Sequence, residues 1–230
     1  MYCWWSMGAL RHHTITTGDH FVAVSGGTIA AAVAICQVDL RRCLLATPDN
    51  IATMSQLYGA LHRWLDDILP AEAHLLCSDR LIIASRDLLG RMQYTDQFET
   101  RMALLDAIMT ACNLPLHTGF LRRAVLNGVD AVVLPATWSV GTHHFPSIRI
   151  DPLCCHPGAT YSQALSVPTR QVATAWIHAG EQYAAGPVLK LTEWVHDQKT
   201  VTGVRWDMIG AGIGMTRLLL YLFHGNRNVD

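Results

Sequence analysis

The chain has 230 residues, of which 50% are hydrophobic and 15% are charged, a composition that favours one domain with a substantial core and argues against long disorder. Its formal net charge is -1 with histidine neutral, which excludes a protein that binds nucleic acid through an overall basic surface. Any contact with phosphates would have to come from local groups of arginines.

The seven cysteines stand at irregular spacings, without a Cys-x-x-Cys pair. We therefore expect reduced thiols in a cytoplasmic protein, with no metal site. The apolar run over residues 21–36 lacks the basic start of a secretion signal and is short for a membrane span. No membrane partner is expected.

The first half of the chain alternates between strand-like and helix-like patterns. The stretch over residues 12–24 predicts a strand that ends near the turn at Gly18 and Asp19, and residues 26–36 predict a helix after a glycine break. Residues 37–50 predict a strand that runs into a Pro-Asp-Asn turn. Apolar residues at helical spacing then predict a helix over 51–69, with Asp49 or Asn50 as its N-cap and Pro70 as its end.

The second half continues the alternation. We expect a short buried strand over 73–78, helices over 79–92 and 96–112, and a further helix over 188–198. Residues 113–168 are richer in proline, glycine and histidine, with strand-like pieces, and are interpreted as an insertion within a single domain. Strands alternating with helices predict an α/β fold with a mostly parallel sheet.

The last part of the chain contains a glycine loop between a predicted strand (204–209) and a predicted helix (216–223). In a nucleotide-binding βαβ unit, such glycines let a ligand approach the backbone, and an acidic residue further on binds ribose hydroxyls. Asp230 is the acidic residue here. A close-packed structural turn is the alternative interpretation of the same glycines.

Four segments, in this order, resemble the permuted (β-class) S-adenosylmethionine-dependent DNA amino-methyltransferases, which methylate adenine N6 or cytosine N4. They are "TTGDHF", "VDLRRCLLATPDN", "WLDDILPAEAHLLCSD" and "GPVLKLTEWVHDQKTVTGVRWDMIGAGIGMT". The family places its catalytic half first and its cofactor loop last, as the order of segments in this chain does. The resemblance implies a Rossmann-like methyltransferase fold, S-adenosylmethionine as cofactor, and a DNA substrate.

The resemblance also implies site residues. The cofactor-binding positions are Gly18, Asp19, Asp207, Ile209, Gly210, Gly212, Gly214, Thr216 and Asp230. The catalytic positions are Thr47, Pro48, Asp49 and Asn50, where the family has a polar residue, two prolines and an aromatic. Here there is one proline and no aromatic, and Tyr58 is a candidate substitute for stacking on a flipped base. Residues 47–50 can equally form a helix N-cap.

Local basic residues in the predicted insertion are the candidate nucleic-acid contacts: Arg122, Arg123 and Arg149. The divergent catalytic motif leaves open an active enzyme, a degenerate one, or a subunit that binds an active partner or forms a homodimer. Two other functions stay open. The closing segment also resembles the last motif of class II aminoacyl-tRNA synthetases, in which Arg217 would hold ATP, and the chain could be a non-catalytic, helix-rich interaction or structural protein.

Overall fold

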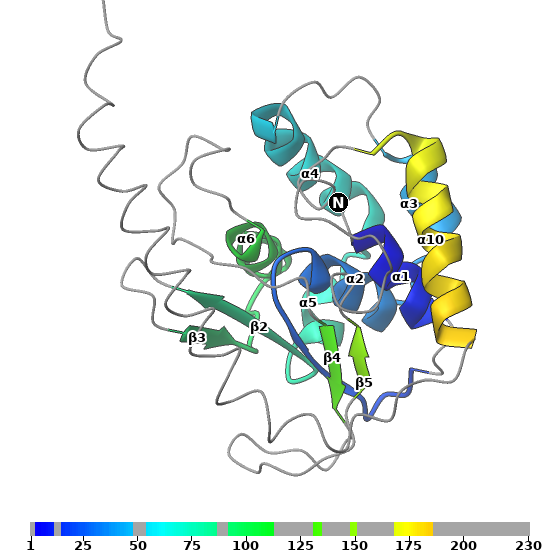
Figure 1. Ribbon diagram of the computed structural model, residues 1–230. Coiled ribbons are helices and arrows are strands. Elements are labelled where there is room, and N and C mark those ends of the chain that lie inside the picture. Colours follow the sequence, from blue (N-terminus) through cyan, green and yellow to red (C-terminus); the bar gives the residue numbers. More distant parts are fainter. Residues whose placement is uncertain are drawn as a thin grey trace, which may run out of the picture.

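The computed structural model describes residues 3–11, 15–47, 54–86, 92–112, 131–134, 148–150 and 168–185 (Figure 1). The described helices are α1 (Cys3–Arg11), α2 (Gly26–Ile35), α3 (Leu40–Leu45), α4 (Met54–Ile68), α5 (Ala73–Cys77), α6 (Arg101–Ala111) and α10 (Arg170–Ala185). The described strands are β1 (His20–Ala23), β2 (Leu81–Arg86), β3 (Met92–Thr95), β4 (Ala131–Leu134) and β5 (Ile148–Ile150).

The strands form one five-stranded sheet in the order β3-β2-β1-β4-β5. β1 pairs in parallel with β2 and antiparallel with β4, while the β2–β3 and β4–β5 pairs are antiparallel. The α/β character expected from the sequence is confirmed. The described sheet is mixed, however, and only one of its pairings is parallel, so the expectation of a mostly parallel sheet does not hold for this part of the chain.

β4 and β5 both come from the segment interpreted as an insertion, residues 113–168. They extend the sheet outward from β1, with Ala23 opposite Ala131 and Ala131 opposite Ile150. The strand-like pieces expected in this segment are confirmed as strands.

Helix α2 lies at the centre of the core. Eight of its ten residues are buried, and small alanines occupy much of its surface. A helix that is apolar on all sides has to be covered on all sides. β1 meets it with an alternating pattern, in which Phe21 and Ala23 are buried and His20 and Val22 are half-buried.

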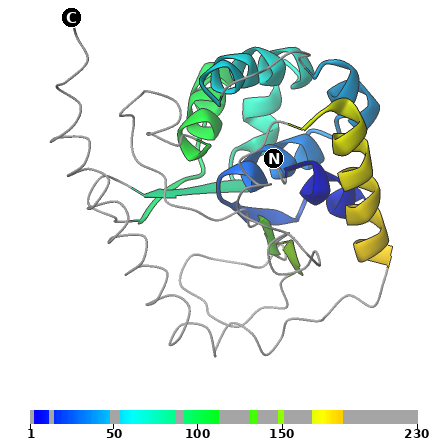
Figure 2. The same cartoon turned by 45° about the horizontal axis from the view of Figure 1, so that its top comes forward.

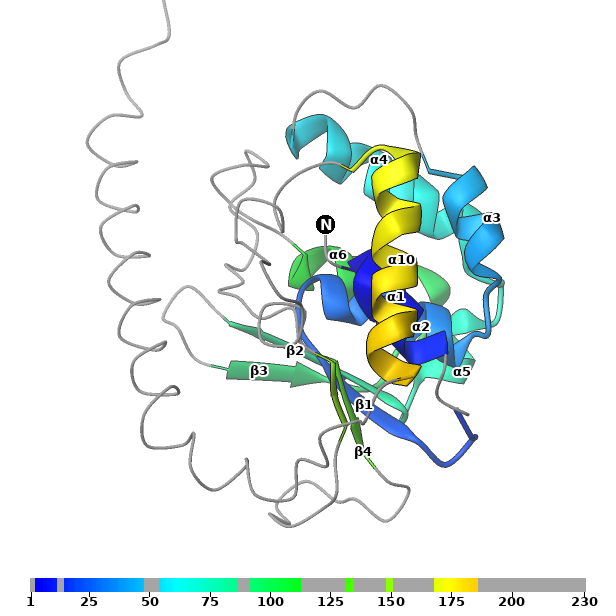
Figure 3. The ribbon, with the colours of Figure 1, turned by 45° about the vertical axis from the view of Figure 1, so that its right-hand side comes forward.

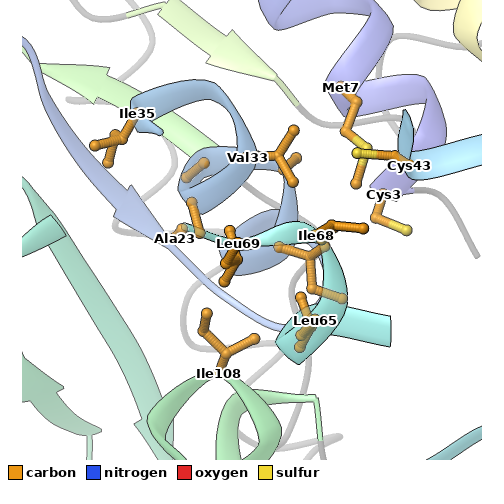
Figure 4. Close-up of a cluster of buried hydrophobic side chains, with 14 of the residues drawn as sticks. Cys3, Met7, Ala23, Val33, Ile35, Cys43, Leu65, Ile68, Leu69 and Ile108 are labelled. Carbon is orange, nitrogen blue, oxygen red and sulfur yellow. The ribbon is translucent and has the colours of Figure 1, made fainter. Parts of the chain in front are cut away.

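Three of the described helices pack directly against α2. α1, α5 and α6 all contact α2, and α6 also contacts β2 (Figure 2). Figure 4 shows Leu65 and Ile68 from α4 and Ile108 from α6 gathered beside α2, near Ala23 at the end of β1. These side chains are fully or almost fully buried. The core therefore packs against both β1 and α2, the strand and the helix that residues 24 and 25 connect.

Polar side chains fix the surrounding helices at their ends. Arg101, the first residue of α6, donates to the carbonyl oxygens of Leu69 (3.1 Å) and Pro70 (3.2 Å) and pairs with Asp66. The last carbonyl groups of a helix have no partner within it, so an arginine here satisfies them. Trp64 of α4 donates its indole N–H to the carbonyl of Cys43 in α3 at 3.0 Å.

Several sequence predictions hold. The helices expected over 26–36, 51–69 and 96–112 correspond to α2, α4 and α6, although α6 begins later, after its N-cap Thr100. The first strand was placed too early, because β1 follows the turn at Gly18 and Asp19. The helix expected over 188–198 lies outside the described residues.

Three predictions were wrong. The strand expected over 37–50 contains helix α3, which Asp39 caps by accepting a hydrogen bond from the Arg41 N–H at 2.9 Å. The strand expected over 73–78 contains helix α5. The helix expected over 79–92 contains β2, whose residues 81–84 are buried on both faces of the sheet and lack the polar alternation of a half-exposed strand.

α1 and α10 pack against each other (Figure 3), and this contact brings the two ends of the described chain together. The helices approach closely because each presents a glycine to the other. A Cβ on Gly8 would overlap the carbonyl oxygen of Ile177, and one on Gly180 would overlap that of Trp5. Backbone atoms cannot move aside as the end of a flexible side chain can.

We therefore predict that Gly180→Ala lowers the free energy of unfolding by about 2 kcal/mol or more, because the two helices must separate. The matched control is Gly59→Ala in α4, where an added Cβ would meet nothing within 4 Å. That change should be neutral or stabilise by up to about 1 kcal/mol. Chemical denaturation measures both, and equal effects of the two substitutions would contradict the close approach of α1 and α10.

Candidate functional site

Ser25 lies between the end of β1 and the start of α2, and its backbone has φ 50° and ψ -129°. A non-glycine residue rarely adopts a positive φ, because its Cβ collides with the backbone. Ser25 shares this sign of φ with Gln37 and Asp79 among the described residues. Its ψ of -129° is far from the left-handed helical value of about +47°. Ser25 is therefore not in the left-handed conformation that non-glycine residues occasionally adopt, and its backbone conformation costs more free energy.

The backbone around Ser25 forms a tight turn. The Gly27 N–H donates to the Val24 carbonyl at 2.9 Å, which closes a four-residue turn with Ser25 in its second position. Its φ and ψ match the second position of a type II′ turn, where glycine is strongly preferred. A serine held there costs on the order of 1–3 kcal/mol, and such strain persists only where surrounding structure enforces it.

The Ser25 carbonyl oxygen shows how the turn is enforced. It accepts hydrogen bonds from the Thr28 N–H at 3.0 Å, the Thr28 hydroxyl at 2.6 Å and the Cys112 thiol at 3.2 Å. Thr28 is fully buried. Burial raises the pKa of Cys112 to about 12, so its sulfur keeps the proton that it donates. Three donors on one carbonyl fix the orientation of the Ser25–Gly26 peptide.

The Ser25 side chain is left available. Ser25 is the N-cap of α2, yet its hydroxyl makes no capping hydrogen bond. Serine is favoured at N-caps because its oxygen usually accepts from the first turn of the helix. Here the hydroxyl does not serve as a cap, and the residue is half-buried, not enclosed.

A polarised N–H group lies next to this hydroxyl. Gly26 is the first residue of α2, and the first N–H groups of a helix have no acceptor within it. They carry the positive end of the helix dipole and stabilise negative charge. A strained serine on a strand-to-helix turn, followed by a donor N–H, is the arrangement of a nucleophile elbow, in which the N–H after the serine binds the oxyanion.

A nucleophilic serine also needs a group that takes its proton. Within the described part of the chain, no acidic or basic side chain hydrogen-bonds to the Ser25 hydroxyl. The register brings the start of β4 beside this end of β1, because Ala131 pairs with Ala23, two residues before Ser25. In the sequence, Ala131 follows Asp130.

Two predicted cofactor residues, Gly18 and Asp19, lie in the turn before β1. The Asp19 carboxylate accepts a hydrogen bond from the Thr16 N–H at 2.7 Å, and Arg80 donates to the Thr16 carbonyl at 2.7 Å. The carboxylate thus holds the turn together. Whether it also contacts a cofactor stays a prediction.

Thr47, a predicted catalytic residue, follows α3. Its hydroxyl donates to the Cys43 carbonyl at 2.9 Å, the same oxygen that Trp64 contacts. Tyr58, the candidate stacking residue, lies in α4 and donates its hydroxyl to the Met109 carbonyl of α6 at 3.1 Å. The Tyr58 hydroxyl thus links α4 to α6, whereas the Thr47 hydroxyl bonds back to the end of α3.

The other predicted site residues fall mostly outside the described part of the chain. These are Pro48, Asp49, Asn50, Arg122, Arg123, Asp207, Ile209, Gly210, Gly212, Gly214, Thr216 and Asp230. Arg149 lies in β5, opposite Val132 of β4, but its side chain is not described. The predicted cofactor loop, catalytic motif and phosphate contacts therefore stay predictions.

Sequence reasoning missed Ser25, which it included in an apolar run. The signal was present as Ala23-Val24-Ser25-Gly26-Gly27, a small-x-Ser-x-Gly pattern between a strand and a helix. Small residues are needed on both sides of such a sharp turn because the strand and the helix approach closely there. Ala23 is fully buried in this position.

The described helices contain none that is both long enough and apolar enough to cross a membrane. Across the same residues, no group of three or more histidine, cysteine or acidic side chains is placed to hold a metal ion. The described cysteines are thiols, not disulfides, as the sequence predicted.

Comparisons with known proteins give one weak similarity. The chain is 18% identical over 124 residues to omega-hydroxyceramide transacylase of Mus musculus, a match that covers 49% of this chain and 21% of the mouse protein. The match thus spans about a fifth of the length of that relative. No family model and no solved structure matches the chain.

We predict that Ser25→Gly raises the free energy of unfolding by about 1 kcal/mol, because glycine adopts the positive φ without strain. The control is Ala103→Gly in α6, which should lower it by about 1 kcal/mol, the usual cost of glycine in a helix. Chemical denaturation compares the two. Equal destabilisation by both substitutions would show that the Ser25 backbone is not strained.

Proposed function

We propose that this chain catalyses acyl transfer from an ester substrate, with Ser25 as the nucleophile. The observation that carries the proposal is the strained backbone of Ser25, which joins a strand to a buried helix and leaves the hydroxyl without a capping role. Strain of this size is retained in proteins mostly where function requires it. A purely structural turn at this position would be made at lower cost by glycine.

In the proposed reaction, the Ser25 oxygen attacks the ester carbonyl and loses its proton to a general base. The carbonyl oxygen becomes an oxyanion, which the Gly26 N–H and the N-terminus of α2 stabilise. As this intermediate collapses, the protonated base gives its proton to the leaving oxygen, so the alcohol departs and the acyl group stays on Ser25. Water or a second alcohol then takes the acyl group and restores the serine.

The similarity to the mouse protein supports the same chemistry. The name of that protein describes a transacylase, an enzyme that moves an acyl group from one molecule to another. Because the identity is low and the match is short, the proposal takes from this similarity only the class of reaction, acyl transfer. The acyl donor and acceptor of this chain belong to the proposal.

The general base in this proposal is Asp130. Its sequence neighbour Ala131 pairs with Ala23, at the same edge of the sheet from which the chain turns to Ser25. A carboxylate can accept the serine proton directly. Where another side chain lies between the carboxylate and the serine and takes the proton, the carboxylate stabilises the positive charge on that side chain.

Methyl transfer from S-adenosylmethionine to a DNA base stays a separate proposal, and so does the Rossmann-like arrangement that it requires. It is supported by the order of the four sequence segments, and its cofactor loop lies outside the described residues. The two proposals use different residues, so one can fail without the other.

We predict that an alkyl fluorophosphonate labels Ser25 and that Ser25→Ala abolishes the label. Hydrolysis of a p-nitrophenyl ester should fall at least about 10³-fold, because the nucleophile is lost. Trypsin places Ser25 in the peptide 12–41, in which it is the only serine, so mass spectrometry locates the label.

The matched control is Thr17→Ala, an exposed hydroxyl residue in the same peptide, which should keep both label and activity. Retained hydrolysis in Ser25→Ala would contradict the acyl-transfer proposal. Calorimetric titration with S-adenosylmethionine, compared between wild type and Gly212→Asp, tests the methyl-transfer proposal on the same preparations.

We predict that Asp130→Asn lowers ester hydrolysis about 10²- to 10⁴-fold while the protein stays folded, the usual range for loss of a general base. Protonation of Asp130 should lower the wild-type rate at low pH. Because asparagine cannot take up a proton, this fall should be absent from the pH–rate profile of the residual activity in the variant. Asp151→Asn, which follows β5 in the sequence, is the control carboxylate and should change the rate much less. A larger loss in Asp151→Asn would reassign the base.

A further inference from the structure

Two cysteine thiols meet at the far end of α2 from Ser25. Cys36 follows the last turn of α2, and Cys77 ends the short helix α5. Their sulfur atoms lie 3.9 Å apart, although the residues are 41 positions apart in the sequence. The two helices are in contact, so the pair is part of the packed structure.

The two thiols differ in solvent exposure and in pKa. Cys36 is partly exposed, whereas Cys77 is fully buried. A hydrogen bond from Cys77 lowers the pKa of Cys36, and the positive charge of Arg80 lowers it further, against the opposing effects of burial and Glu72. The same hydrogen bond and burial raise the pKa of Cys77.

The other described cysteines lack this environment. Burial raises the pKa of Cys3 to about 11 and that of Cys43 to about 12. Cys112 is held by its hydrogen bond to the Ser25 carbonyl. Thiolates, not thiols, attack disulfides, so among these five cysteines Cys36 is the one set up to react first.

We propose that Cys36 and Cys77 form a reversible disulfide, a redox site in which Cys36 reacts first with a small oxidised disulfide such as glutathione disulfide and Cys77 resolves the product. The sulfurs must approach from 3.9 Å to the bonded distance of about 2.05 Å. Cys36 is the C-cap of α2 and is half-buried, so its side chain is not enclosed on every side.

The exchange balances in two steps. The Cys36 thiolate attacks one sulfur of glutathione disulfide, forms a mixed disulfide and releases one glutathione thiolate. Cys77 then gives up its proton and attacks the Cys36 sulfur, which forms the protein disulfide and releases the second glutathione. The two cysteines lose two electrons, and the two glutathione molecules carry them away.

The disulfide would close a loop that contains α3 and α4. Closing a long loop removes conformations from the unfolded chain and so stabilises the folded state. The oxidised protein should therefore unfold at a higher temperature than the reduced protein. This consequence does not depend on the reaction proposed for Ser25.

The test treats the native full-length chain with glutathione disulfide, blocks remaining thiols with iodoacetamide and digests with trypsin. Cys36 lies in peptide 12–41 and Cys77 in peptide 64–80. We expect these two peptides joined, two hydrogen masses lighter than their sum, and separated again by dithiothreitol. The joined form and the rise in unfolding temperature should both be absent from Cys36→Ser and from Cys77→Ser.

Cys43→Ser is the matched control, a buried cysteine in peptide 43–63 that should leave the linkage and the temperature rise intact. Circular dichroism confirms that each variant is folded. A linkage between other peptides, or glutathione that stays on Cys36 without transfer to Cys77, would overturn the proposal. Because peptide 12–41 also carries Ser25, the fluorophosphonate label reports the proposed acyl-transfer site separately in the same digest.

Discussion

The burial of α2 is the constraint on which the rest of the described structure depends. Its apolar residues, among them Ile29, Val33 and Ile35, each contribute about 1.5–3 kcal/mol only if every side of the helix is covered. β1 and β2 cover it from the sheet, and α1, α5 and α6 cover it from the other sides. The alanines between the larger residues allow these neighbours to approach closely, so each neighbour has little freedom to move.

A helix held this firmly can impose an unfavourable conformation on the residue before it. The strain at Ser25 is of the same order as the contribution of one buried aliphatic side chain, so the core can sustain it. Thr28 and Cys112 transmit the constraint directly, because both donate to the Ser25 carbonyl. Cys112 is the C-cap of α6, so the packing of α6 against α2 also sets the turn. The geometry at Ser25 is thus a property of the whole core.

How far the sequence predicts this structure depends on the length of each segment. The long amphipathic pattern of α4 and the apolar run of α2 identify helices because many residues agree. The short segments of α3 and α5 fit strand and helix equally well, and a polar cap at Asp39 decides the first. For the candidate site, the small-x-Ser-x-Gly pattern around Ser25 is visible in the sequence. The backbone angles of Ser25 cannot be predicted from the sequence, because they arise from contacts with Thr28 and with Cys112, 87 positions away.

The proposed reactive groups lie at the two ends of the buried helix α2. A helix of ten residues is about 15 Å long, so Ser25 and the thiol pair at Cys36 cannot touch each other. Any influence of the thiol pair on the serine would have to pass through packed elements, either α2 itself or α5 and α6, which contact each other. Since α2 is rigidly packed, a bond at its C-terminal end would change how readily α5 separates from it, not the angles of the turn at its N-terminal end. Redox state and acyl transfer would therefore act on different properties, the first on stability and the second on chemistry.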